Sequence, residues 1–166
     1  QNANLSDLAM NWDDSVSWAA SLTHGGFDDW RLPSLHVSEL GGNCDLGNDG
    51  TDCGYNVLTA NSELAYMFYE NLGNIGYFDT NGNGPQTGWD SLNTEFTDMV
   101  TGNTVSFINL ERTFYWSGTE FEPDTDGAWY FYTNDGRQGS FFKSSVYYAW
   151  AVRDGDVTEV PEPSTL

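Results

Sequence analysis

The strongest constraint on the fold is a change of pattern near residue 105, where short strand-like runs begin. The runs are Val105–Leu110, Phe114–Thr119, Ala128–Thr133, Gly139–Lys143 and Val146–Val152. The tripeptide Asn134-Asp135-Gly136 separates two of them and is typical of a tight β-hairpin turn. Because strands joined by short connections pair antiparallel, we expect a twisted antiparallel sheet in this half of the chain.

The part of the chain before residue 105 has helical spacing and loop composition instead. Acidic residues at 13 and 14 precede apolar residues at helical intervals, and Gly25-Gly26 follows as a stop signal. Three helices are expected, over about 13–23, from Ser34 to Gly41-Gly42, and from about Ser62 to Leu72. Residues 73–104 show no clear period and are expected to form a long irregular loop. Helices followed by a sheet indicate the α+β class, with two to three helices.

The charge balance excludes several classes of partner. The 166 residues include 25 Asp and Glu but only 5 Lys and Arg, which gives a net charge of −20. Nucleic acids and anionic membranes need clustered basic residues, so neither is an expected partner. Hydrophobic residues at 39% and aromatic residues at 16% predict one folded domain rather than a disordered acidic tail. No apolar run approaches the ~20 residues of a membrane span.

The two cysteines enclose a short polar loop. Cys44 and Cys53 are separated by Gly, Asn, Asp and Thr residues and one leucine. A pair that closes such a loop favours a local disulfide formed in an oxidising compartment. Two free thiols are the alternative.

Two loops contain oxygen ligands at spacings that suit calcium. Asp79, Asn81 and Asn83 match the opening of a calcium loop, Gly84 allows its sharp turn, and Asp90 falls at the twelfth position. The alternative is a turn-rich loop that binds no ion. The loop between the cysteines is a second candidate, with Asp45, Asn48, Asp49 and Asp52 as its ligands.

Adjacent aromatic residues in two strand-like runs are candidates for contact with a sugar or a partner protein. They are Trp129, Tyr130, Tyr132, Tyr147, Tyr148 and Trp150. Because successive side chains of a strand point to opposite faces, one member of each adjacent pair could face solvent. The alternative is that helices and loops cover both faces of the sheet.

Sequence motifs for catalysis are missing from the chain. His24 and His36 are single residues, and no nucleophile elbow, zinc-protease motif or phosphate loop is present. We therefore expect a protein that is not an enzyme and has no catalytic residues.

Five segments together resemble a known family. They are Asn11–Asp14, Gly26–Ser34, Tyr115–Glu120, Ala128–Phe131 and Tyr148–Arg153. In this order they are similar to the Lcl-type C-terminal domain, which is grouped with C-type-lectin-like folds. The resemblance covers residues 1–157 and implies a lectin-like arrangement with long irregular loops. It also implies core positions for Trp116 and Trp129, and carboxylate partners such as Asp28 or Asp29 for Arg31 and Arg153.

The last residues resemble a sorting signal. Val160–Leu166 contains Pro161, Glu162 and Pro163 and is similar to the motif of PEP-CTERM proteins. We therefore treat residues 158–166 as an extended tail. The resemblance implies a secreted or cell-surface protein of a Gram-negative bacterium, in biofilm or floc material.

Two functions follow as expectations. The first is a non-enzymatic matrix or surface protein that acts by adhesion and by self-assembly into a homopolymer or filament. Family members usually have an opening β-strand upstream of the matched region, and a sheet without it would have an open edge for another chain. The alternative is a glycan-binding lectin-like module that uses calcium. The expected partners are further copies of the chain and extracellular polysaccharide.

Overall fold

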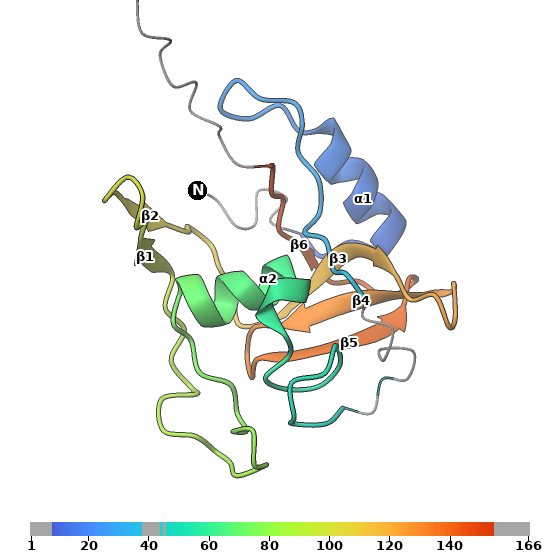
Figure 1. Cartoon of the computed structure of the whole chain (residues 1–166). Helices are drawn as coiled ribbons and strands as arrows, with labels where there is room; N and C mark the ends of the chain where they lie inside the picture. The colour runs from blue at the N-terminus through green and yellow to red at the C-terminus, as the bar shows by residue number, and fades with distance from the viewer. Residues whose placement is uncertain (1–7, 38–43, 45, 155–166) are drawn as a thin grey trace, which may run out of the picture.

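A four-stranded sheet organises the molecule (Figure 1). The computed structural model describes residues 8–37, 44 and 46–154. The strands are β3 (Phe114–Glu120), β4 (Gly127–Tyr132), β5 (Arg137–Phe142) and β6 (Tyr148–Ala149), in the spatial order β5-β4-β3-β6. The fold class is α+β, as expected, and the arrangement is consistent with a lectin-like fold. None of the helices in these ranges has the length and apolar character needed to cross a membrane.

Helix α1 (Trp12–Ser21) packs on one face of the sheet. Asn11 caps the helix by accepting a hydrogen bond from the Asp14 N–H, and acidic residues in the first turn favour the positive end of the helix dipole. The buried residues Trp12 and Ala19 pack against the sheet cluster Trp116, Ala128 and Tyr130. The helix predicted over about 13–23 is confirmed, with slightly different ends.

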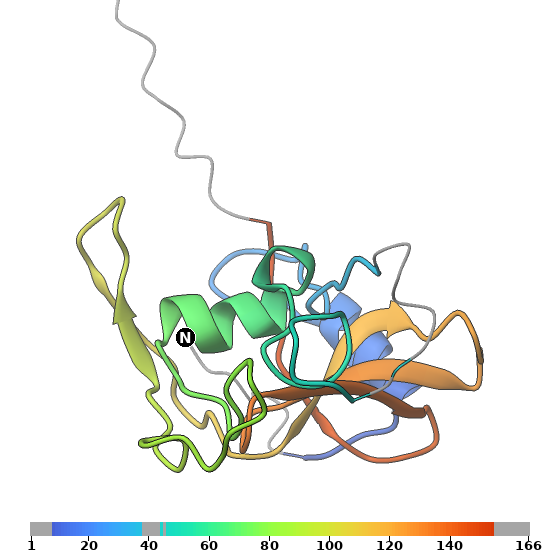
Figure 2. The ribbon, with the colours of Figure 1, turned by 60° about the horizontal axis from the view of Figure 1, so that its bottom comes forward.

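The second helical segment packs on the opposite face (Figure 2). A short turn, η1 (Thr59–Asn61), leads into α2 (Glu63–Ala65), which continues as the π-helical η2 (Tyr66–Asn71). Ser62 caps α2 by accepting a hydrogen bond from the Ala65 N–H. The buried residues of this segment are Leu64, Ala65, Phe68 and Leu72, and they pack with Tyr115, Phe131 and Trp150. The helix predicted from Ser62 to Leu72 is therefore confirmed.

A small hairpin extends away from this core (Figure 2). Its strands are β1 (Glu95–Thr97) and β2 (Thr104–Ser106). The Asp98 carboxylate accepts hydrogen bonds from the Val100 and Thr101 N–H groups and so fixes the turn. Met99 and Val100 at the tip are 94% and 95% exposed. The predicted loop over 73–104 thus includes one strand of a hairpin, and the run expected over 105–110 is a strand only through Ser106.

Two expectations about the fold are wrong. The sheet is mixed, because β6 runs parallel to β3, with Tyr115 opposite Tyr148 and Trp116 opposite Ala149. The helix expected to begin at Ser34 does not form over 34–37, and its remaining residues lie outside the described ranges. Instead, Leu35 forms a β-bridge with Ser62, and the Glu63 carboxylate accepts a hydrogen bond from the Ser34 N–H at 2.6 Å. The carboxylate that binds this backbone N–H thus comes from 29 residues away in the chain.

The predicted hairpin turn at Asn134-Asp135-Gly136 is confirmed between β4 and β5. Gly136 has a φ of 80°, and a Cβ there would lie 2.4 Å from the Tyr69 hydroxyl oxygen. Both the backbone conformation and the available space therefore require glycine at this position.

Gln138 on β5 connects three parts of the fold. Its side chain is buried, its Oε1 accepts a hydrogen bond from the Ser62 hydroxyl, and its Nε2 donates to the Asp52 carbonyl, each at 2.6 Å. Its backbone also exchanges two hydrogen bonds of 2.8 Å with Gly54. Gln138 thus ties the sheet to the start of α2 and to the loop of the two cysteines.

Gln138→Met should lower the free energy of unfolding by about 2–4 kcal/mol, because it removes the acceptor of the buried Ser62 hydroxyl and the side-chain donor to the Asp52 carbonyl. Gln86→Met is the matched control. Gln86 also donates to two carbonyls, those of Gly76 and Phe78, both at 2.9 Å, but from a half-buried position. The control should lose about 1 kcal/mol. Equal losses in urea denaturation would contradict the assigned role of Gln138.

Candidate functional site

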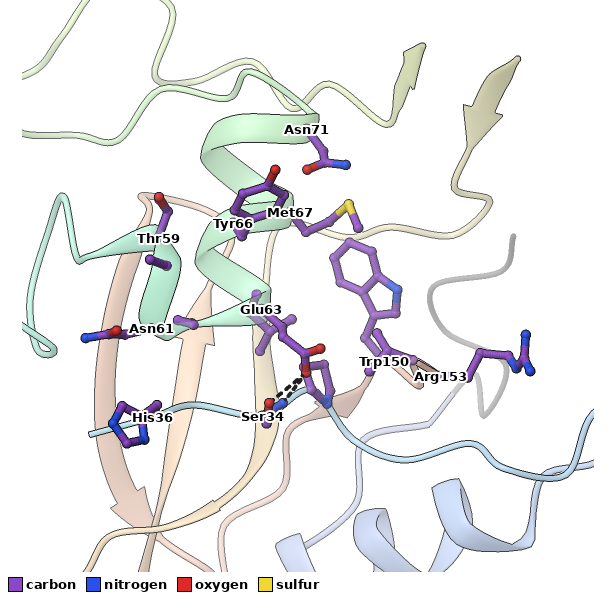
Figure 3. A pocket seen from close by; sticks show the side chains of 15 residues that line it. Ser34, His36, Thr59, Asn61, Glu63, Tyr66, Met67, Asn71, Trp150 and Arg153 are labelled. Atoms are coloured by element: carbon purple, nitrogen blue, oxygen red, sulfur yellow. Dashed lines mark hydrogen bonds between the residues drawn. The ribbon is translucent and has the colours of Figure 1, made fainter. Parts of the chain in front are cut away.

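A cleft of about 480 Å³ lies between the second helical segment and β6 (Figure 3). One wall consists of residues 59–64, 66, 67 and 71, and the other consists of residues 33, 34, 36, 150, 152 and 153. Figure 3 shows Tyr66, Met67 and Asn71 on the helical wall, with Trp150 across from Met67. Clefts of this volume are in the range of ligand sites in proteins.

Trp150 provides an apolar surface in this cleft. Its ring packs edge-on against Phe107 at 4.9 Å and against Tyr115 at 5.8 Å, and the whole residue is only 3% exposed. Within the described residues, the Trp150 indole N–H donates to no acceptor. A ligand in the cleft would therefore meet an aromatic edge with one available donor.

An ion pair closes one end of the cleft. Arg31 binds Glu63 through two hydrogen bonds, Nη1–Oε2 at 2.6 Å and Nη2–Oε1 at 3.0 Å, and it also binds Asp154. Burial by itself would raise the pKa of Glu63, but hydrogen bonds from Arg31 and from the Ser34 N–H and hydroxyl lower it below its ordinary value. Glu63 is therefore ionised at neutral pH.

The second arginine of the cleft is also paired. Arg153 Nε donates to Asp29 Oδ1 at 2.9 Å, and its guanidinium lies 3.6 Å from the centre of the Phe27 ring. The hydrogen bond from Arg153 lowers the pKa of Asp29. The expected pairing of Arg153 with Asp29 is confirmed. For Arg31 the expectation of Asp28 or Asp29 is wrong, because the chain brings Glu63 and Asp154 to it instead.

A second candidate surface lies on the opposite face of the sheet, beyond α1. Five stacked or edge-packed rings form it, and we call them the aromatic ladder: Phe114, Tyr130, Tyr132, Phe141 and Tyr147. Phe114 stacks on Tyr132 at 3.9 Å and on Tyr147 at 4.7 Å. The Arg137 guanidinium lies 5.6 Å from the centre of the Tyr132 ring.

The ladder is partly open to solvent. Phe141 is 48% exposed, and Phe114, Tyr132 and Tyr147 are half-buried. Burial raises the pKa of Tyr147 to about 12, so its hydroxyl is a neutral donor at ordinary pH. The surface thus combines apolar rings with hydroxyl and guanidinium donors.

The structure separates the six aromatic residues predicted from the sequence. Tyr130, Tyr132 and Tyr147 come together in the ladder. Trp129 is fully buried and Trp150 nearly so, because α2 and the segments beside it cover that face of the sheet. Neither offers an exposed ring face to a sugar or a partner in this fold, and Trp150 reaches the surface only as part of the cleft lining. The core position expected for Trp129 is confirmed.

Tyr148 lies on the same covered face and is half-buried. Sequence reasoning missed Phe114 and Phe141, the other two members of the ladder. Alternation along β3 places Phe114 on the same face as Trp116, but that signal becomes useful only once the face covered by α1 is known.

The first calcium candidate is a loop closed by its own side chains. Asp79 Oδ1 accepts hydrogen bonds from the Asn81 and Asn83 N–H groups at 2.9 and 2.8 Å, and the Asn83 amide donates to Asp79 Oδ2 at 3.0 Å. The side-chain bond from Asn83 and the backbone bonds lower the pKa of Asp79. The backbone carbonyl of Asp90 accepts a hydrogen bond from Arg112.

The residues of the second calcium candidate differ in their exposure to solvent. Asp45 lies outside the described residues, Asp49 is exposed, and Asp52 is buried with its Oδ1 accepting a 3.2 Å hydrogen bond from Asn61. Cys44 and Cys53 form the predicted disulfide. Among the residues that the structure describes, no group of three or more His, Cys, Asp or Glu is placed to hold a metal ion. The tail residues Pro161, Glu162 and Pro163 lie outside the described ranges.

The Glu63–Arg31 pair predicts a pH dependence of stability. Because the pKa of Glu63 is lowered in the folded state, its contribution is present above the unfolded-state pKa and is lost as the pH falls through the folded one. Glu63→Gln should cost about 1 kcal/mol at pH 7, and this difference from the unmodified chain should shrink below about pH 4.5.

Glu70→Gln is the control for this titration, because Glu70 accepts a hydrogen bond from the neutral Thr59 hydroxyl at 3.0 Å. Urea denaturation between pH 3 and 7 measures all three proteins. A Glu63→Gln difference that stays constant over this range would be evidence against the ion pair.

Comparison with known proteins gives one finding about the whole chain. Residues 1–153 match the Lcl C-terminal domain family. Neither the curated proteins nor the solved structures gave a match. Since the match extends over most of the 166 residues, the chain belongs to the Lcl C-terminal domain family.

Proposed function

We propose that this chain is a non-enzymatic adhesion module of an extracellular matrix or cell surface, and that the aromatic ladder binds polysaccharide. The observation that carries the proposal is the set of packed, partly buried rings with Tyr132 at its end and the exposed Phe141 at its open side. Aromatic faces pack against the apolar faces of sugar rings. Hydroxyl and guanidinium groups beside them bind the sugar hydroxyls.

The charge of the chain narrows the class of polysaccharide. A net charge of −20 repels anionic polymers, and Arg137 is the cation that contacts the ladder. The ligand of the ladder is therefore a neutral polysaccharide. An acidic polysaccharide would need bridging cations.

The ionisable groups of the cleft support a non-enzymatic role. Glu63 is held by Arg31, and Arg153 is held by Asp29, so both charges already serve as structural partners. His36 is exposed at the rim of the cleft, without a hydrogen bond to another described side chain. The Ser34 hydroxyl donates to the Glu63 carboxylate at 3.0 Å, but the ion pair with Arg31 lowers the pKa of that carboxylate and so makes it a weak base for activating a nucleophile.

The proposed location rests on three supports. The disulfide between Cys44 and Cys53 suits an oxidising compartment. The chain belongs to the Lcl C-terminal domain family. Val160–Leu166 resembles a sorting signal of surface proteins of Gram-negative bacteria. Together these favour a matrix or surface protein of biofilm or floc material, which would assemble into a homopolymer or filament.

Binding to the ladder can be tested with Tyr132→Ala, which removes the ring that stacks on Phe114. Ile108→Ala is the control, because it removes an apolar side chain that is 63% exposed and belongs to neither the ladder nor the cleft. The probes are cellulose, a β-1,3-glucan and dextran, with alginate as the acidic comparison. The Tyr132 variant should bind the preferred neutral polymer at least about fivefold more weakly, as expected for the loss of about 1 kcal/mol of ring contact.

Phe141→Ala provides a second ladder variant at an exposed position, in case Tyr132→Ala alters the fold. Near-ultraviolet circular dichroism verifies the packing of each variant. Equal binding by the ladder and control variants, or stronger binding to alginate than to every neutral polymer, would refute the assignment.

Calcium binding by the loop over residues 79–90 is a separate part of the proposal. The Asp79 and Asn83 side chains lie side by side in this loop, and Asp79 is ionised more readily than an ordinary aspartate. Calcium at about 1 mM, the range of weak extracellular sites, should raise the melting temperature. Asp79→Asn should remove the increase, whereas Asp98→Asn, at another aspartate that closes its own turn, should retain it. A melting temperature unaffected by calcium in the unmodified chain would exclude the site.

A further inference from the structure

We propose that the cleft beside Trp150 binds the Val160–Leu166 segment of a second copy of this chain. The inference does not rest on polysaccharide binding, because the ladder lies on the other face of the sheet. It gives a physical basis to the self-assembly that the sequence predicts.

The chemistry of the cleft suits a proline-containing peptide. Tyr66, which is 50% exposed, is the accessible ring of its lining, and Met67 and the edge of the largely buried Trp150 lie deeper in the cleft (Figure 3). Proline-rich segments bind in aromatic-lined grooves because their extended conformation is already formed and leaves the backbone carbonyls free. The Trp150 indole N–H, which has no acceptor among the described residues, can donate to such a carbonyl.

The proposed occupant of the cleft is a segment that comes soon after the last described residue in the sequence. Val152 and Arg153 line the cleft, and Asp154 is bound to Arg31 at its end. Residues 155–166 come next in the sequence and span at most about 40 Å when extended. Within them, Val160–Leu166 contains two prolines, two aliphatic residues and a single acidic side chain, Glu162.

Charge favours the segment of a second copy over the chain's own segment. The linker 155–159 contains Asp156 and Glu159. Folding it back would crowd these acids beside Asp154 and Glu63, within the screening length of about 8 Å at physiological salt. A segment from a second copy can enter while its linker remains in solvent.

Two cations of this acidic chain lie beside the cleft, each bound to carboxylates. Arg31 and Arg153 are two of only 5 basic residues in the chain, and both lie at the end of the cleft where residue 154 is held. Their positive charge offsets the neighbouring carboxylates there. A segment with one glutamate therefore meets less repulsion at the cleft than at most of the surface.

Such a contact is heterologous, because the cleft and the segment are different parts of the chain. Each copy offers one segment and accepts one. Contacts of this type generate a ring when the rotation closes and a filament when it does not.

Complementary variants of the full 166-residue chain test the proposal. The cleft variant, Tyr66→Glu, places a charge at the rim and keeps the segment intact. The segment variant, Pro161→Gly with Pro163→Gly, removes the preformed conformation and keeps the cleft intact. Val100→Glu at the hairpin tip is the matched control for the added charge, because Val100 is exposed and lies outside the cleft.

Sedimentation velocity between about 1 and 100 μM measures the assembly, a range that brackets weak specific contacts. The unmodified chain and the Val100→Glu control should form larger species as the concentration rises, and each of the other two variants alone should remain a monomer. Their equimolar mixture should form a dimer, since one supplies the segment and the other the cleft. In this mixture, the amides of 160–166 in the cleft variant should exchange hydrogen at least tenfold more slowly than in that variant alone.

Three results would overturn the proposal. One is an unmodified chain that stays monomeric over the whole range. Another is an assembly that both variants retain. The third is slow exchange of 160–166 at every concentration in a monomer, which would place the segment in its own cleft. Polysaccharide binding by Tyr132→Ala reports on the ladder separately, so failure of one proposal does not imply failure of the other.

Discussion

The buried amide of Gln138 is the contact on which the arrangement of the other parts depends. It satisfies the Ser62 hydroxyl at the start of α2 and the Asp52 carbonyl beside the disulfide, while its own backbone extends the sheet toward Gly54. Because a buried polar group without a partner is costly, only one placement of the helix and loop on β5 satisfies all three. The position of the helical wall of the cleft relative to Trp150 follows from this placement.

Local signals in the sequence were sufficient for the elements that stabilise themselves. Asp13, Asp14 and the helical spacing after them predicted α1, and Asn134-Asp135-Gly136 predicted the turn between β4 and β5, because helix starts and turns depend on neighbours in the chain. The parallel pairing of β6 could not be predicted in this way, since it joins residues 115 and 148 without any local signal. At Ser34 a local cap signal was misleading, because the carboxylate of Glu63 binds the same N–H from 29 residues away.

The sequence predicted only part of the candidate surfaces, for a related reason. Alternation tells which aromatic side chains share a face, but it does not tell which face a helix covers. Tyr130, Tyr132 and Tyr147 were therefore predicted together with Trp129 and Trp150, although α2 and its neighbours bury the two tryptophans. The cleft had no sequence signal at all, because its walls come from three separate stretches of the chain.

The domain has one candidate binding surface on each side of its sheet. The ladder packs on the side of the sheet that α1 covers, whereas the cleft lies on the side of α2 and its neighbours. Filling one therefore leaves the approach to the other unobstructed. In a row of such domains, the valency for a long polymer rises with each added copy, and weak individual contacts combine into strong retention through avidity rather than through affinity.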